Sequence, residues 1–230
     1  ATFPAIRHVK IPHLNRPGPD VDIQGKVVWT TCSPTSVGGF TAVGYFFGRT
    51  LHRELGVPVG LIGTNWGGTK IEPWIPPVGF RLVPELKELA SLVNQWDSTS
   101  ESGKAAVLKV LPEVREWLTQ AEAALATNGP VPPMPRIPEP PPGHQEPTKL
   151  YNGMIHPLIP YAIRGAIWYQ GESNGGEGTS YLHKMQALVR GWRQVWGQGE
   201  FPFYYVQLAD FQKATENPSG GDGWARLREA

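Results

Sequence analysis

The sequence contains a single cysteine, Cys32, among its 230 residues. One thiol excludes an internal disulfide framework and any metal cluster built from cysteines. Cys32 could act as a nucleophile, but no convincing base is recognisable beside it. We therefore expect a buried, unreactive thiol.

Long apolar runs and charge of one sign are also scarce. No apolar run approaches the roughly 20 residues that a membrane-spanning helix requires. Lysine and arginine number 21 against 20 aspartate and glutamate residues, so the formal net charge is only +1. This balance gives no electrostatic reason to expect nucleic acid or an anionic membrane as a partner.

Signatures of metal and nucleotide binding are missing as well. The six histidines show no HExxH or other metal-binding spacing. The glycine-rich stretch 63–68 lacks GxGxxG, and no P-loop lysine signature occurs. A glycosidase pair of Glu172 with Glu177 or Asp210 has no supporting motif. The motifs thus support neither a metal site nor a nucleotide cofactor.

Aromatic residues, glycine and proline are plentiful instead. Nine tryptophans and seven tyrosines could include rings that stack on sugar faces, although most are expected in the core. Nine of the 24 prolines lie between residues 130 and 147. That segment is predicted to be an extended excursion, interpreted as a spacer, with an SH3-type ligand as the weaker alternative.

The order of predicted elements indicates the fold class. Helices are expected at 37–55, ending at Gly56, at 179–196 and from 224 onward, with a helical hairpin inside 84–128. Strands are expected at 6–11, 27–30, 57–62, 165–169 and 203–208. Such alternation is typical of an α/β fold with a doubly wound parallel sheet. We interpret residues 1–230 as one domain with a helical and proline-rich insertion at about 80–148.

Two glycine-rich polar turns follow predicted strands, at residues 63–69 and 170–174. In open α/β sheets, ligands bind outside the carboxyl ends of the strands. Main-chain N–H groups of Gly67 or Gly68 and a carboxamide of Gln170 or Asn174 could together form an oxyanion hole for acyl transfer. The structural alternative is that Ser173 or Asn174 caps the following helix.

The same stretches carry a family resemblance. Residues 56–69 (GVPVGLIGTNWGGT), 150–158 (LYNGMIHPL) and 168–174 (WYQGESN), with the helix 40–49 (FTAVGYFFGR), resemble the sialate O-acetylesterase family of SGNH/GDSL hydrolases. The resemblance implies a flavodoxin-like SGNH fold and no cofactor. It also implies that a serine acyl-enzyme mechanism hydrolyses O-acetyl esters on a sugar.

Site residues follow from matching this chain to the family blocks. Gly67 or Gly68 matches the glycine of the second block, and the turn 170–174 matches the third block, with Gln170 favoured over Asn174 as oxyanion donor. Glu172 is expected to orient the turn as a hydrogen-bond acceptor. Expected wall residues for the sugar, with core packing as an equal alternative, are Trp66, Trp74 and Tyr169.

The sequence departs from the family pattern in two places. The Gly-Gln-Ser-Asn-Met block with the nucleophilic serine and the Asp-x-x-His block are both missing. We therefore interpret the chain as a partial or processed piece whose nucleophile and Asp/His pair lie in a flanking or companion segment. A secreted, periplasmic or lysosomal setting is favoured only by family analogy, and the acetylated sugar is left open.

Two alternatives remain. A complete esterase could use a non-standard triad of Ser36 or Ser173 with His156 and Asp210. A protein of another class would be a catalytically inactive sugar-binding module that uses the tryptophans.

Overall fold

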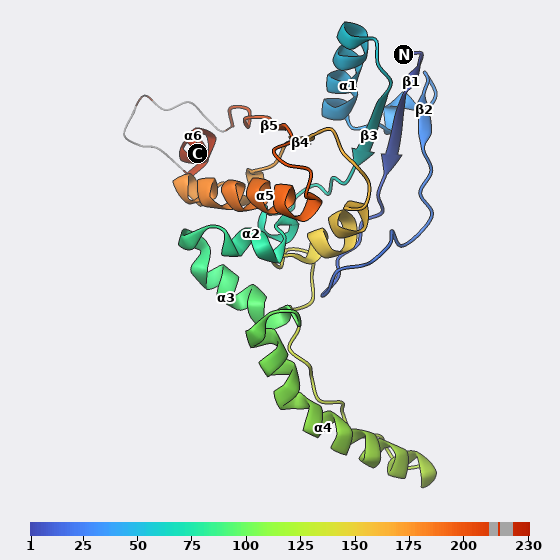
Figure 1. The fold of residues 1–230 in the computed structure, drawn as a ribbon, viewed down its shortest axis with the longest axis vertical. Helices are drawn as coiled ribbons and strands as arrows, with labels where there is room; N and C mark the ends of the chain where they lie inside the picture. The colour runs from blue at the N-terminus through green and yellow to red at the C-terminus, as the bar shows by residue number, and fades with distance from the viewer. Residues whose placement is uncertain (212–215, 217–222) are drawn as a thin grey trace.

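The computed structural model describes residues 1–211, 216 and 223–230. Figure 1 shows a small sheet and helix α1 at one end, a body around α5, and a long helical arm at the other end. Part of the predicted domain 1–230 lies outside the described residues, and its assignment as one domain stays a prediction. None of the described helices is long and apolar enough to span a membrane.

The first sheet has the strand order β2-β1-β3. Strand β1 (Phe3–Lys10) pairs in parallel with β3 (Val59–Gly63) and in antiparallel fashion with β2 (Thr30–Cys32). The strands predicted at 6–11 and 57–62 are confirmed, and the one predicted at 27–30 forms only from residue 30. Cys32 is a free, buried thiol, as expected.

Helix α1 (Ala42–Leu55) packs against this sheet. It begins five residues later than predicted because the Thr41 side chain accepts a hydrogen bond from the Gly44 N–H and caps the helix there. Residues Val37–Gly39 form a separate 3₁₀ turn, η1. The predicted end is confirmed, since Gly56 adopts a left-handed conformation with φ of 66°.

The expected single doubly wound sheet is not formed by the described residues. Strands β4 (Ala166–Trp168) and β5 (Phe203–Tyr205) pair in parallel as a separate two-stranded sheet. Each has only three residues, and no described strand joins them to β3. Tyr204 and Tyr205 are exposed, so β5 is not the interior strand that its apolar sequence predicts. The α/β class itself is confirmed.

The body of the protein is built around helix α5 (Tyr181–Trp196), which was predicted, packed on the short helix α2 (Pro77–Arg81). A Cβ at Gly79 would lie 2.4 Å from the main-chain oxygen of Ala187, so glycine is required where the two helices approach. Four of the nine tryptophans pack against one another here in edge-to-face or tilted contacts, namely Trp74, Trp168, Trp192 and Trp196.

The remaining helices and turns connect these parts. Their bounds are η2 (Glu72–Trp74), η3 (Pro84–Leu86), α3 (Lys87–Trp96), α4 (Glu101–Ala126), η4 (Tyr151–Ile155), η5 (His156–Leu158), η6 (Glu172–Asn174), η7 (Gly178–Ser180) and α6 (Gly223–Glu229). Helix α6 confirms the helix predicted from residue 224 onward.

Helices α3 and α4 confirm the two predicted helices but not the predicted hairpin. Instead of folding back on α3, α4 extends away from the body (Figure 1). The proline-rich segment returns alongside α4, where the Trp117 Nε1–H donates to the main-chain oxygen of Pro132 at 2.7 Å. The extended segment thus takes the packing position that a second helix would have filled.

Candidate functional site

The two glycine-rich turns meet although about 100 residues separate them in the sequence. The Gln170 Nε2–H donates to the main-chain oxygen of Thr69 at 3.0 Å, and the Ser173 hydroxyl donates to that of Gly68 at 2.9 Å. A hollow of about 270 Å³ lies between the turns. It is lined by Trp66, Gly67, Gly68, Thr69, Tyr169, Gln170, Glu172 and Ser173.

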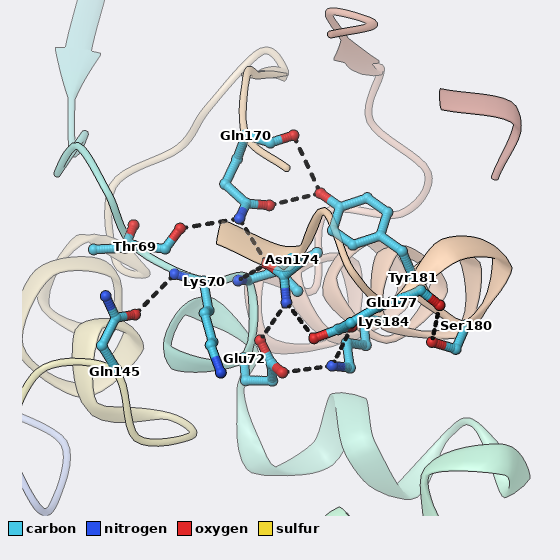
Figure 2. Close-up of polar contacts among 11 residues, drawn as sticks. Thr69, Lys70, Glu72, Gln145, Gln170, Asn174, Glu177, Ser180, Tyr181 and Lys184 are labelled. Carbon is cyan, nitrogen blue, oxygen red and sulfur yellow. Dashed lines mark hydrogen bonds and ion pairs between the residues drawn. The ribbon is translucent and has the colours of Figure 1, made fainter. Parts of the chain in front are cut away.

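Most of the expected site residues therefore line one hollow, but Asn174 does not. Its side chain is buried, with a relative exposure of 1%. Its Oδ1 accepts the Ile71 N–H at 3.0 Å and the Gln170 Nε2–H at 2.8 Å, while its Nδ2 donates to Glu72 and Glu177. Both amide hydrogens are engaged inside the protein, so the structure places Asn174 as a buried connector of the two turns (Figure 2).

Gln170 lines the hollow, yet its carboxamide is also fully hydrogen-bonded within the protein. One Nε2 hydrogen is directed at Thr69 and the other at Asn174. Its Oε1 accepts the hydroxyl of Tyr181 at 2.6 Å. Burial raises the pKa of Tyr181 far above its ordinary value, so this hydroxyl keeps the proton that it donates. Gln170 could donate to a ligand only by releasing one of these internal partners.

Trp74 also lies outside the hollow that it was expected to line. It is 3% exposed, and its Nε1–H donates to the Thr69 hydroxyl at 3.0 Å. That hydroxyl in turn donates to the main-chain oxygen of Trp66 at 2.8 Å. Trp74 thus supports the first turn from the core side.

A partly buried ion cluster lies beneath the turns. The Lys184 ammonium contacts both Glu72 and Glu177, and all three side chains are at most a quarter exposed. Burial alone would raise the pKa of Glu72. The hydrogen bonds from Lys184 and Asn174, together with the Lys184 charge, outweigh burial and hold this pKa below its ordinary value. Glu72 is therefore ionised at neutral pH, and together with Glu177 it accepts from the Asn174 Nδ2 and fixes the orientation of that amide.

The main-chain N–H groups of Gly67 and Gly68 are unpaired in the part of the chain that the structure describes, unlike the side-chain amides of Gln170 and Asn174. Among the described residues, neither group has a hydrogen-bond acceptor. Gly68 has φ of +75°, a conformation that favours glycine, whereas Gly67 does not require glycine on this ground. A Cβ at either position would meet no atom within 4 Å. Packing does not explain the glycine at Gly67, and two free donors face no protein partner.

Trp66 lines the hollow with its ring already in contact with two imidazoles. His13 and His144 stack on it with centroid separations of 4.3 and 4.6 Å and interplanar angles of 8° and 9°. Tyr169 is half exposed and lines the hollow too. Among the three expected wall residues, Trp66, Trp74 and Tyr169, the side chain of Tyr169 is the most exposed.

The alternative internal triad is not assembled in the part of the chain that the structure describes. Ser36 donates to the main-chain oxygen of Thr31, and Ser173 to that of Gly68. His156 Nδ1 contacts the main-chain oxygen of Asp20 at 2.8 Å, and Asp210 pairs with Arg228. Likewise, no three His, Cys, Asp or Glu side chains of the described residues are grouped as metal ligands would be.

Sequence reasoning missed the supporting residues Glu72, Gln145, Tyr181 and Lys184. A local signal existed for two of them, because Tyr181 and Lys184 lie three residues apart in the predicted helix 179–196. That spacing places side chains on one helical face. Neither Glu72 nor Gln145 shows such a local pattern, since their partners lie far away in the sequence.

The chain is similar to known carbohydrate esterases. Residues 142–220 match the family model described as carbohydrate esterase, sialic acid-specific acetylesterase. The mouse sialate O-acetylesterase is 30% identical over 206 residues, which cover 80% of this chain and 32% of the mouse protein. The human sialate O-acetylesterase is 31% identical over 199 residues, which cover 82% of this chain and 28% of the human protein.

A solved structure is similar over the whole chain. The crystal structure of a carbohydrate acetylesterase from Xanthomonas citri has 31% identity and a TM-score of 0.66, covering 100% of this chain and 39% of that one. The fold thus belongs to the class of carbohydrate esterases. Within it, the chain belongs to the sialic acid-specific acetylesterase family, which confirms the resemblance seen in the sequence. The chain spans about a third of the length of its curated relatives.

Replacing Lys184 tests the ion cluster. We expect Lys184→Met to lower the free energy of unfolding by about 3 kcal/mol at pH 7, because two carboxylates would lose their cation. The loss should shrink below about pH 5, where protonation removes the unpaired negative charge. Urea denaturation at several pH values measures both effects.

The matched control is Lys104→Met, which removes an exposed partner of Glu101. It should change the free energy of unfolding by less than about 0.5 kcal/mol. Equal effects of the two substitutions would contradict a structural role for the Lys184 cluster.

Proposed function

We propose that this chain is the oxyanion-stabilising part of a carbohydrate O-acetylesterase that acts through a serine acyl-enzyme. The observation that carries the proposal is the pair of unpartnered N–H groups of Gly67 and Gly68 beside a hollow. Main-chain donors of this kind stabilise the negative oxygen that forms when a nucleophile attacks an ester carbonyl. Family membership supplies the reaction class.

In the proposed mechanism, a serine oxygen adds to the acetyl carbonyl and the carbonyl oxygen becomes negative. Gly67 and Gly68 donate to this oxygen while a histidine takes the serine proton and passes it to the sugar oxygen that leaves. Water then attacks the acetyl-enzyme by the same route and releases acetate. We place the serine and the Asp/His pair outside these 230 residues, in a flanking segment or a companion chain, because their blocks are missing from the sequence.

Gln170 and Asn174 receive different roles from the one first expected. Their amide hydrogens have internal partners, so we assign them to holding the two turns together and leave oxyanion donation to the glycines. Should Gln170 release Thr69 when substrate binds, its carboxamide would become a third donor at the wall of the hollow.

The proposed substrate is an O-acetylated sugar or glycan. Tyr169 offers a half-exposed ring that a sugar face can cover, and Glu172 offers a carboxylate that can accept from sugar hydroxyls. The relatives are named for sialate and for carbohydrate acetyl esters. A sugar-binding module without turnover is the second candidate, and the accessible Tyr169 ring is the observation that favours it.

Hydrolysis of p-nitrophenyl acetate separates these functions. We expect the 230-residue chain to be close to inactive, and a longer form that includes its flanking sequence to release p-nitrophenol and to be blocked by a serine-directed inhibitor. Serine-inhibitor-sensitive activity of the short chain would contradict the assignment of the nucleophile. Two folded but inactive proteins that bind acetylated glycans would favour the binding module.

Alanine at the two glycines tests the proposed donors. Gly67→Ala should leave the free energy of unfolding unchanged or raise it by up to about 1 kcal/mol, because its surroundings are open and alanine restricts the unfolded chain. It should lower kcat of the active form at least about tenfold, since its methyl group stands beside the donors.

Gly68→Ala is the comparison, because its φ of +75° makes alanine unfavourable by about 1 kcal/mol or more. A Gly67→Ala protein with full activity would overturn the assignment of this turn as the oxyanion hole.

A further inference from the structure

The end of the proline-rich segment contacts the glycine turn directly. The Gln145 Nε2–H donates to the main-chain oxygen of Gly68 at 2.8 Å, and the Gln145 Oε1 accepts the N–H of Lys70 at 2.9 Å. Figure 2 shows the second of these bonds. One carboxamide therefore binds two main-chain groups of one short stretch, across 75 and 77 residues of sequence.

The residue before Gln145 contacts the same turn from its other end. His144 stacks on Trp66, which directly precedes the two glycines. Two neighbouring side chains of the proline-rich segment thus hold the turn on both sides of Gly67. The segment is more than the spacer that its composition predicts.

The remaining polar groups around the turn are also fixed. The Gly68 oxygen accepts a second hydrogen bond from Ser173, and the Thr69 oxygen accepts one from Gln170. Rotation of the Gly68–Thr69 peptide would break the bonds from Gln145 and Ser173 together. A turn held in this way keeps its two free N–H donors in one orientation before any charge develops, which is the condition for electrostatic catalysis.

We propose that Gln145 is a positioning residue for the oxyanion-binding turn, a role that rests on the proposed function. It contacts no reacting atom and acts by holding the main chain on either side of Thr69. The role needs a donor and an acceptor at the end of a long neutral side chain. Glutamate keeps only the acceptor for Lys70, and methionine keeps neither at similar length.

The contact itself is tested on the 230-residue chain by amide hydrogen exchange with NMR. In Gln145→Met, protection of the Lys70 amide should fall at least about tenfold, because its acceptor is gone. In Gln145→Glu it should stay within about threefold of the original value, because a carboxylate oxygen still accepts this N–H. The Ile75 amide, bonded to the Glu72 oxygen, is the internal reference and should not change.

The catalytic consequence is tested in the form of the protein that hydrolyses acetyl esters. Both substitutions should lower kcat by about 10- to 100-fold and leave KM within about threefold, because the turn serves the transition state more than the bound substrate. A merely structural role would instead lower thermal stability without this split between kcat and KM. The matched control is Gln120→Met, on the exposed face of α4, which should alter neither constant.

The outcomes separate the two proposals. Unchanged Lys70 protection in Gln145→Met, or unchanged kcat in both variants, would overturn the positioning role while hydrolysis by the unsubstituted protein upholds the proposed function. If the unsubstituted longer protein hydrolyses no acetyl ester, the proposed function fails, and the catalytic part of the role fails with it.

Discussion

The carboxamide of Asn174 is the interaction on which the rest of the site depends. Its four hydrogen bonds join the main chain after the first turn, the side chain of the second turn, and two carboxylates below them. A buried amide that satisfies all of its donors and acceptors specifies one arrangement, because any other leaves polar groups unpaired in a dry interior. The two turns therefore have a defined separation, and the hollow between them has a defined shape.

Charge keeps this carboxamide in its orientation. Glu72 and Glu177 accept from the amide nitrogen, and Lys184 contacts both carboxylates. The hydrogen bonds from Lys184 and Asn174 outweigh burial and hold the pKa of Glu72 below its ordinary value, so this carboxylate can only accept. Gln170 is fixed in the same way between Thr69, Asn174 and Tyr181. The amide hydrogens of Gln170 and Asn174 are therefore all bonded within the protein. The main-chain N–H groups of Gly67 and Gly68 have no partner among the described residues and are free to bind a ligand.

Local features of the fold were predictable where the residues concerned act on their neighbours. Gly56 ends a helix and the turn at Gly67 follows a strand, because short-range backbone preferences decide both. The strands were recognised from their apolar runs, but the sheet was not, since such runs do not reveal which strands pair. Helix α4 is helical as predicted, but it does not pack back on α3, because the apolar pattern of a helix does not reveal which element it packs against.

Burial and long-range contacts decided the roles within the site. Trp74 and Tyr169 both lie near the turns in sequence, yet one supports the turn from the core and the other is half exposed. Gln145 had no sequence signal at all, because its partners lie more than 70 residues away on the main chain of another segment. The family resemblance pointed to the two turns and left open which of their donors are free, a question that only the hydrogen-bond partners can answer.

Native-state hydrogen exchange of the Ile71 amide tests the central claim most directly, since this N–H donates to the Asn174 Oδ1. If the Asn174 connection holds the turns, this amide should exchange as slowly as those of buried residues in α5 such as Leu188, through global unfolding alone. Exchange at the rate of an exposed turn would show that the connection opens freely and would contradict the account.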